Sequence, residues 1–235
     1  MKKEKTCKIV FSDIDGTLLT SDGQITEGTK EMILNLEKKG IPFILTSARS
    51  PEGVRVIKRM LGNHAPIIAF CGGLILDNDG NEIYSKMIPL KRALELKAML
   101  DKDFPAVACN TFGGEKWIVD DRDDWREQRE EKIVGFPAEI GSIKDTFETE
   151  GGIHKFLLMG DSDVMTKLAA VLARDFSDLQ SAASNPEYLE ITAAGVEKSE
   201  GLKTLCGKLG ISPEEAAAFG DGESDLSMMR AAGFG

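Results

Sequence analysis

Short apolar runs that alternate with amphipathic stretches constrain the fold of this chain more than any other feature of its sequence. Buried strands are predicted for the runs at residues 8–12, 41–46, 66–70 and 216–219. Helices are predicted between the first three strands, at 26–39 and 51–61, because Thr26 and Ser50 are favourable helix-capping residues. Strands that alternate with helices in this way form a parallel sheet covered on both faces, so we predict an α/β, Rossmann-like fold.

The middle of the chain has a different pattern, which indicates a second domain. Hairpins are predicted at residues 74–84 and 106–119, a strand at 154–159, and helices at 89–100, 121–132 and 162–173. The α/β pattern is expected to resume near Leu189, with a helix at 198–209. We therefore predict a discontinuous core of residues 1–85 and 187–235, interrupted by an α+β domain at 86–186.

The charge balance argues against two classes of partner. The chain has 29 basic and 39 acidic residues and a net charge of −10, so we expect neither nucleic acid nor an anionic membrane to bind it. No apolar run approaches the roughly 18 residues that a membrane-spanning helix needs. The four cysteines are widely spaced, which favours reduced thiols and a cytoplasmic location. An acidic chain that binds phosphate would need a local cation.

The stretch FSDIDGTLL places two carboxylates, Asp13 and Asp15, immediately after a predicted strand. One interpretation is a solvated strand end with an Asp-Gly turn. A calcium loop is excluded because Thr17, Leu18 and Gln24 do not match its ligand positions. The third interpretation is a nucleophile and its acid/base partner beside a metal ion, since open α/β sheets bind ligands at the carboxyl ends of their strands.

The third interpretation predicts functional groups at the ends of other core elements, and the sequence provides them. Ser47 and Arg49 follow the second strand, Lys198 opens the helix before the last strand, and Asp221 and Asp225 follow that strand. Individually, each has an ordinary explanation as a helix cap, a surface lysine or a first-turn acid. Together they indicate one site.

The order DxDGT, S-x-R, K and GDxxxD resembles the haloacid dehalogenase-like hydrolases. The size and position of the inserted domain are similar to those of Cof-type phosphatases, the type IIB members with a C2 cap. The resemblance covers nearly the whole chain, and it implies a phosphatase that acts on small phosphorylated metabolites. It also implies that the inserted domain is a cap that selects the substrate.

The resemblance implies a role for each acidic residue of the motifs. Asp13 would be the nucleophile that forms an aspartyl-phosphate, and Asp15 would be the general acid and base. Asp221, the Asp13 carboxylate and the Asp15 carbonyl would hold Mg²⁺, while Asp225 would bind the ion or orient its water shell.

The resemblance also implies a set of phosphate-binding residues. Ser47 would hydrogen-bond a phosphoryl oxygen, and Lys198 would offset the charge of nucleophile and phosphate. Backbone N–H groups at Gly16 and Thr17 would approach the phosphate, and Arg49 matches an arginine of the family's Thr-Gly-Arg stretch.

Three positions depart from the family pattern. Ser224 and Cys71 stand where asparagine is usual, and Ala48 replaces a glycine, which suggests that this position does not need a positive φ. The resemblance also leads us to expect a further core strand and a final helix after Gly235. Two other functions stay open, a phosphohexomutase-type phosphotransferase and a catalytically impaired protein that binds phosphorylated metabolites. A monomer or a weak homodimer is expected.

Overall fold

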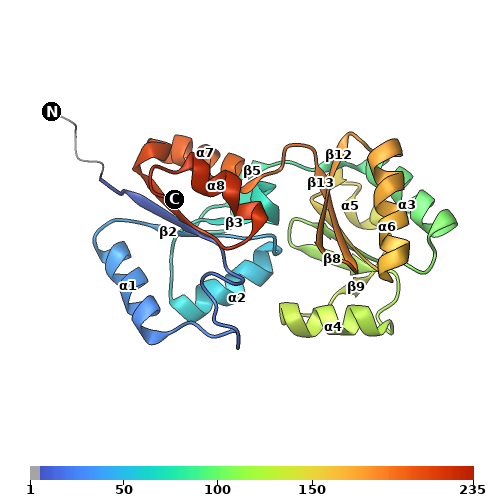
Figure 1. Cartoon of the computed structure of the whole chain (residues 1–235), viewed down its shortest axis with the longest axis horizontal. Coiled ribbons are helices and arrows are strands. Elements are labelled where there is room, and N and C mark those ends of the chain that lie inside the picture. Colours follow the sequence, from blue (N-terminus) through green and yellow to red (C-terminus); the bar gives the residue numbers. More distant parts are fainter. Residues whose placement is uncertain (1–5) are drawn as a thin grey trace. The chain divides into compact units, whose positions relative to one another are not determined.

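The computed structural model describes residues 6–235, which form two compact units. The first unit comprises the chain up to Ser85 together with Val196–Gly235, and the second is Lys86–Gly195 (Figure 1). The second crossing therefore lies nine residues later than the predicted boundary at 186/187. The reason is strand β13 (Tyr188–Ala193), which pairs with β11 (Lys155–Met159) in the second unit.

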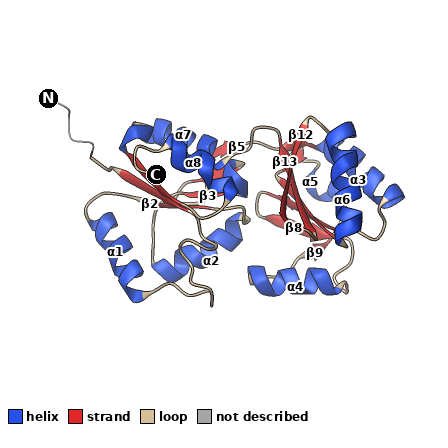
Figure 2. Ribbon diagram, viewed as in Figure 1, coloured by secondary structure: helices blue, strands red, loops and turns tan. Residues whose placement is uncertain are grey.

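The sheet of the first unit confirms the predicted α/β class. Its strand order is β14 (Ala216–Phe219), β1 (Ile9–Ser12), β2 (Phe43–Thr46), β3 (Ile67–Ala69), β4 (Leu74–Leu76) and β5 (Glu82–Ser85). The first four strands of this order run parallel, and the β4–β5 hairpin is antiparallel (Figure 2). Phe234 forms a parallel bridge with Ala217 on the side of β14 away from β1, the side where a further strand is expected.

Helices cover both faces of this sheet. The elements are α1 (Glu27–Lys38), α2 (Pro51–Leu61), α7 (Lys198–Leu209) and α8 (Leu226–Ala231). Helices α1 and α2 lie on one face, and α7 and α8 lie on the other (Figure 1). The caps act as predicted, because the side chains of Thr26 and Ser50 accept hydrogen bonds from the backbone amides of Thr29 and Gly53.

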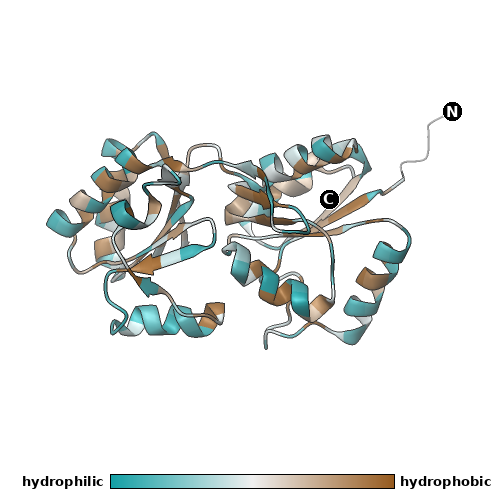
Figure 3. Cartoon of the chain, turned by 180° about the vertical axis from the view of Figure 1, so that it is seen from behind, coloured by the Kyte–Doolittle hydropathy of each residue, from teal (hydrophilic) through white to brown (hydrophobic). Residues whose placement is uncertain are grey.

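Apolar packing fixes the strands against helix α7. Ile9, Phe11 and Ile44 are fully buried in a cluster that also contains Leu202 and Leu205 of α7. Each such side chain contributes roughly 1.5–3 kcal/mol on burial. Figure 3 shows the strands of this unit as predominantly hydrophobic, while its helices carry both kinds of residue. The carboxyl ends of the parallel strands are thereby held at one edge.

The second unit is an α+β domain. Its main sheet has the order β12 (Leu179–Asn185), β13, β11, β7 (Ala108–Gly113), β8 (Lys116–Val119) and β9 (Glu139–Ile140). Its helices are α3 (Leu90–Asp103), α4 (Trp125–Val134), α5 (Ile143–Phe147) and α6 (Ser162–Asp175), and a small ladder joins β6 (Ile88–Pro89) to β10 (Gly152–Ile153). Helix α4 begins four residues later than predicted because Asp124 caps it, accepting a hydrogen bond from the backbone N–H of Arg126.

No helix within residues 6–235 combines the length and the apolar character that crossing a membrane requires.

Candidate active site

The ends of two neighbouring parallel strands bring the first acidic residues together. Asp13 directly follows β1, and Asp221 comes two residues after β14. The backbone N–H of Asp13 donates a hydrogen bond to the carbonyl of Phe219, 3.0 Å away, which ties the two strand ends together. Strand β1 lies between β2 and β14, where the strand order reverses, and this is the ligand-binding position of open α/β sheets.

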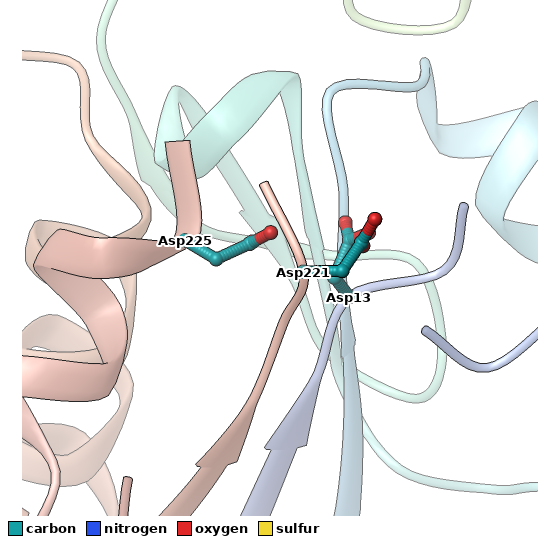
Figure 4. A group of neighbouring side chains, drawn as sticks. All are labelled: Asp13, Asp221 and Asp225. Atoms are coloured by element: carbon teal, nitrogen blue, oxygen red, sulfur yellow. The ribbon is translucent and has the colours of Figure 1, made fainter. Parts of the chain in front are cut away.

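Asp13, Asp221 and Asp225 form a carboxylate cluster in which one oxygen from each residue lies within 4.8 Å of the others. Asp225 ends a short 3₁₀ helix, η3 (Glu223–Asp225), and its carboxylate points toward the other two (Figure 4). Asp13 and Asp225 are buried, whereas Asp221 is exposed. A set of hard oxygen donors with one solvent-facing member suits Mg²⁺, which binds carboxylates while keeping several waters.

Lys198 lies between the two buried carboxylates. Its Nζ is 2.5 Å from Asp13 Oδ1 and 2.6 Å from Asp225 Oδ1, and the residue is only 3% exposed. Burial raises the pKa of Asp13 and outweighs the opposing charge and hydrogen bond of Lys198. Burial is also the largest influence on Lys198, where it lowers the pKa, but the two aspartates together raise that pKa above its ordinary value. The ammonium therefore stays charged.

The start of α7 lies close to the backbone of residues 70–72, and this packing places Lys198 between the two carboxylates. The 3₁₀ turn η1 (Phe70–Gly72) packs against the start of α7, and a Cβ atom on Gly72 would lie 2.4 Å from the carbonyl oxygen of Glu197. Gly72 also has a φ of +102°, which favours glycine. Its neighbour Cys71 adopts a φ of 55°, a left-handed conformation that asparagine tolerates better than most residues. This conformational preference matches the asparagine usual at this position in the family.

Asp15 and Arg49 form a bidentate ion pair. Arg49 Nε is 2.8 Å from Asp15 Oδ2, and Arg49 Nη2 is 2.7 Å from Asp15 Oδ1. The Asp15 side chain is 57% exposed and that of Arg49 is 19% exposed. The sequence placed Arg49 among the substrate-binding residues. In the structure its guanidinium contacts the predicted acid/base residue, and its role in substrate binding stays a prediction.

Gly16 and Thr17 shape the surroundings of Asp221. The Thr17 hydroxyl donates a hydrogen bond to Asp221 Oδ1 at 2.8 Å. Gly16 has a φ of +82°, and a Cβ atom there would lie 2.3 Å from Asp221 Oδ2. Both residues were predicted to approach phosphate through their backbone N–H groups. Their contact with Asp221 was not predicted, because it depends on how the β1 and β14 loops meet.

Ser47 is buried at the end of β2, where backbone and side chain are both hydrogen-bonded. Its hydroxyl oxygen accepts from the backbone N–H of Arg49 at 3.1 Å, and its carbonyl accepts from the N–H of Cys71 at 2.8 Å. The hydroxyl retains its own proton as a donor for a further partner. Ser224, by contrast, is exposed in η3, and its side chain hydrogen-bonds to none of the described residues. The φ of Ala48 is not positive, as expected from the alanine that replaces the family's glycine.

Comparison with known proteins gives one consistent result. The sequence profile described as haloacid dehalogenase-like hydrolase matches residues 10–235. A Haemophilus influenzae protein with a provisional phosphatase name is 31% identical over an alignment of 237 positions, which covers 97% of this chain and 85% of that protein. A haloacid dehalogenase-like hydrolase from Bacteroides thetaiotaomicron superposes with a TM-score of 0.86 at 24% identity, covering 97% and 86% of the two chains. The sugar phosphatase BT4131, of subclass IIB, shares the fold at a TM-score of 0.78 and 21% identity, covering 96% and 85%.

Proposed function

Because this chain belongs to the haloacid dehalogenase-like hydrolases and is a phosphatase, we propose that it hydrolyses small phosphorylated metabolites through an aspartyl-phosphate on Asp13. The observation that carries the proposal is the buried Asp13 carboxylate at the end of β1, paired with Lys198 and beside two further carboxylates. Sugar phosphates are the favoured substrates, because one relative of the same fold is named a sugar phosphatase.

The proposed reaction has two halves that use the same two aspartates. In the first, an Asp13 carboxylate oxygen attacks phosphorus, the bond from phosphorus to the ester oxygen breaks, and the departing alkoxide takes a proton from Asp15. In the second, Asp15 takes a proton from a water molecule whose oxygen attacks phosphorus. The bond between phosphorus and Asp13 then breaks, which releases inorganic phosphate and restores the carboxylate.

Asp15 can act as an acid only when its carboxyl group has left Arg49 and carries a proton, which it retains from the water molecule of the preceding turnover or takes from solvent. Both of its oxygens accept hydrogen bonds from the guanidinium. The Asp15 side chain is 57% exposed, so water screens the pair and can replace the guanidinium when the two groups separate. We propose that the phosphoryl group of the substrate becomes the new partner of Arg49, which frees Asp15 when substrate is present. Ser47, Gly16 and Thr17 would donate to the same phosphoryl group.

Mg²⁺ would be held by the Asp13 and Asp221 carboxylates with the Asp15 carbonyl. When bound, it supplies positive charge that offsets the charge of the phosphoryl group. Asp225 has a supporting part in this proposal, because its two oxygens already accept from Lys198 and from the backbone N–H of Gly222, 3.0 Å away. Asp225 thus orients Lys198, and any effect it has on the metal is through the water shell.

The second unit is proposed to act as the cap that selects the substrate, and a cytoplasmic location is proposed from the reduced cysteines. Within residues 6–235 none of the four cysteines forms a disulfide. The proposal for the cap follows from the resemblance to type IIB members and from the α+β fold of Lys86–Gly195. The boundary at Gly195 defines the segment that a domain-exchange experiment would replace.

The test is phosphate release from a panel of sugar phosphates, measured with Mg²⁺ and with EDTA. We expect steady release that needs Mg²⁺ and disappears in Asp13→Asn, because an amide is too weak a nucleophile to attack phosphorus. Asp22→Asn, at an exposed position, is the matched control and should keep full activity. Activity that persists in Asp13→Asn would contradict the nucleophile. An isomerised sugar phosphate without phosphate release would indicate a phosphotransferase instead.

A further inference from the structure

Three basic side chains lie along α2, from its middle to the end that is farther from the proposed active site. Arg55, Lys58 and Arg59 are spaced i, i+3 and i+4, so they are neighbours on the helix surface. Helix α2 begins next to Ser50 and ends at Leu61, and at about 1.5 Å per residue its two ends are roughly 15 Å apart. Lys58 and Arg59 lie in the last turn of α2, where the helix dipole favours cations, and Arg55 adds a third positive charge beside them.

These side chains border a cavity of about 300 Å³, the lower end of the range typical of small-molecule pockets. One wall is formed by the last turns of α2 and by residues 62–64, and the other by the hairpin turn at 77–80. Ile67 and Leu76, which are 2% and 5% exposed, supply apolar surface. All of these residues belong to the first unit. The cavity thus combines cations with an apolar wall.

Lys58 is the cation that is left for a ligand. It is half-buried, and its ammonium forms neither a hydrogen bond nor an ion pair with any residue in the described part of the chain. Arg59, in contrast, pairs with Glu52 at 2.7 Å. Burial lowers the pKa of Lys58 and the charge of Arg55 lowers it further, while the charges of Glu37 and Asp77 oppose this shift only in part, so the two cations repel. An anion between them would relieve this repulsion.

The acidic residue that lines the cavity, Asp77, already accepts hydrogen bonds within the hairpin turn. Asp77 accepts hydrogen bonds from the backbone N–H groups of Asp79 and Asn81, at 2.9 and 2.8 Å, and from the side-chain amide of Asn81 at 3.0 Å. Its hydrogen bonds are made within the hairpin turn, and its charge still attracts Lys58 and raises the pKa of that lysine, although the two side chains form no direct ion pair. The nearby Arg55 guanidinium also reaches the turn, where Nη2 is 3.9 Å from the position of a Cβ on Gly80.

We propose that this cavity is a second ligand site, which binds a small organic anion with a phosphate or carboxylate group on an apolar body. The anionic group contacts Lys58, and the body lies against Ile67 and Leu76. The site is independent of the proposed catalytic function, because it shares no residue with the carboxylate cluster.

The test uses amide chemical shifts of the whole chain, which report each site separately. Benzylphosphonate is the phosphate probe, because its carbon–phosphorus bond is not a phosphate ester, and phenylacetate is the carboxylate probe. We expect saturable shifts at the amides of residues 62–64 and of Gly80 with at least one probe, in EDTA. Benzyl alcohol, which lacks the anionic group, should produce none. The stronger of the two anionic probes identifies the preferred head group.

A charge-removing variant tests the assignment of Lys58. Lys58→Met keeps the length of the side chain and should weaken binding roughly tenfold or more, because a charge-assisted contact is lost. Lys208→Met, at an exposed position of α7, is the control and should bind as the original chain does. Shifts confined to the loops around Asp13 and Ser47 would overturn the proposal. Binding that is unchanged in Lys58→Met, or equal for benzyl alcohol, would overturn it as well.

Discussion

Replacing Lys198 by methionine should destabilise the first unit strongly, because this one ammonium neutralises two buried carboxylates. Asp13 and Asp225 are 6% and 1% exposed, and each has an oxygen within 2.6 Å of Nζ. Methionine fills similar space and leaves both acids without their cation. The substitution therefore isolates the electrostatic contribution of Lys198 from its packing.

The expected loss of unfolding free energy follows from the burial of Lys198 and its two carboxylate partners. Removing one partner of a buried ion pair typically costs about 3–5 kcal/mol, because the remaining charge is left unpaired in a poorly solvated site. The free energy of unfolding of an ordinary domain is about 5–15 kcal/mol, so the loss would be a large fraction of the stability of the first unit. It corresponds to a fall in melting temperature of roughly 10 °C.

Urea denaturation in EDTA, followed by circular dichroism, measures this loss. Lys203→Met is the matched control, because Lys203 lies on the same helix and its pair with Glu200 is about half exposed. That variant should lose less than about 1 kcal/mol. Adding Mg²⁺ should restore part of the stability of Lys198→Met, since a bound dication offsets the same carboxylates. Equal midpoints for Lys198→Met and the original chain would refute the reasoning.

Two further predictions concern a backbone position and a buried acid. Gly16→Ala should raise the Mg²⁺ concentration needed for half-maximal phosphatase activity, because its Cβ would lie 2.3 Å from Asp221 Oδ2. Gly23→Ala is the control, because Gly23 also has a positive φ, of +74°, but a Cβ there would have no atom within 4 Å. This control variant has the backbone strain without the contact, so it should leave the Mg²⁺ concentration unchanged. Glu127, 2% exposed and with an Oε2 that lacks a partner among the described residues, has its pKa raised by burial to about 8. The folded chain then holds a proton that the unfolded chain has lost, so stability should fall as pH rises from about 4.5 to 8. Glu127→Gln should flatten this slope in denaturation measured across that range, and an unchanged slope would contradict the assignment.

The elements that the sequence predicted well are those whose signals are local. Helix α7 spans the predicted residues 198–209, and α2 lies between its Ser50 cap and Gly62, which adopts the left-handed conformation of a helix end. The positions of Asp13 and Asp221 at strand ends followed from short apolar runs and from the parallel order of the strands. Such features need no knowledge of distant contacts.

Features that depend on tertiary contacts could not be predicted. The segment Tyr188–Ala193 has an alternating pattern that suits either sheet, and its pairing with β11 decides that it belongs to the second unit. Strand β12, with the sequence LQSAASN, is largely exposed and lacks the apolar signal of a strand. The pairs Lys198–Asp225 and Arg49–Asp15 join residues that are 27 and 34 positions apart. Their geometry follows from the close packing of η1 against α7 and from the loop after β1.

The proposed mechanism requires that Asp13 carry the phosphoryl group between substrate and water. The most direct measurement is rapid acid quench of the enzyme during turnover of a sugar phosphate with Mg²⁺, followed by mass spectrometry of the peptides. We expect a transient phosphate on the peptide that contains Asp13, which is absent in Asp13→Asn and without substrate. A phosphate on another residue, or full turnover with no phosphorylated peptide under quench conditions that preserve acyl phosphates, would contradict it.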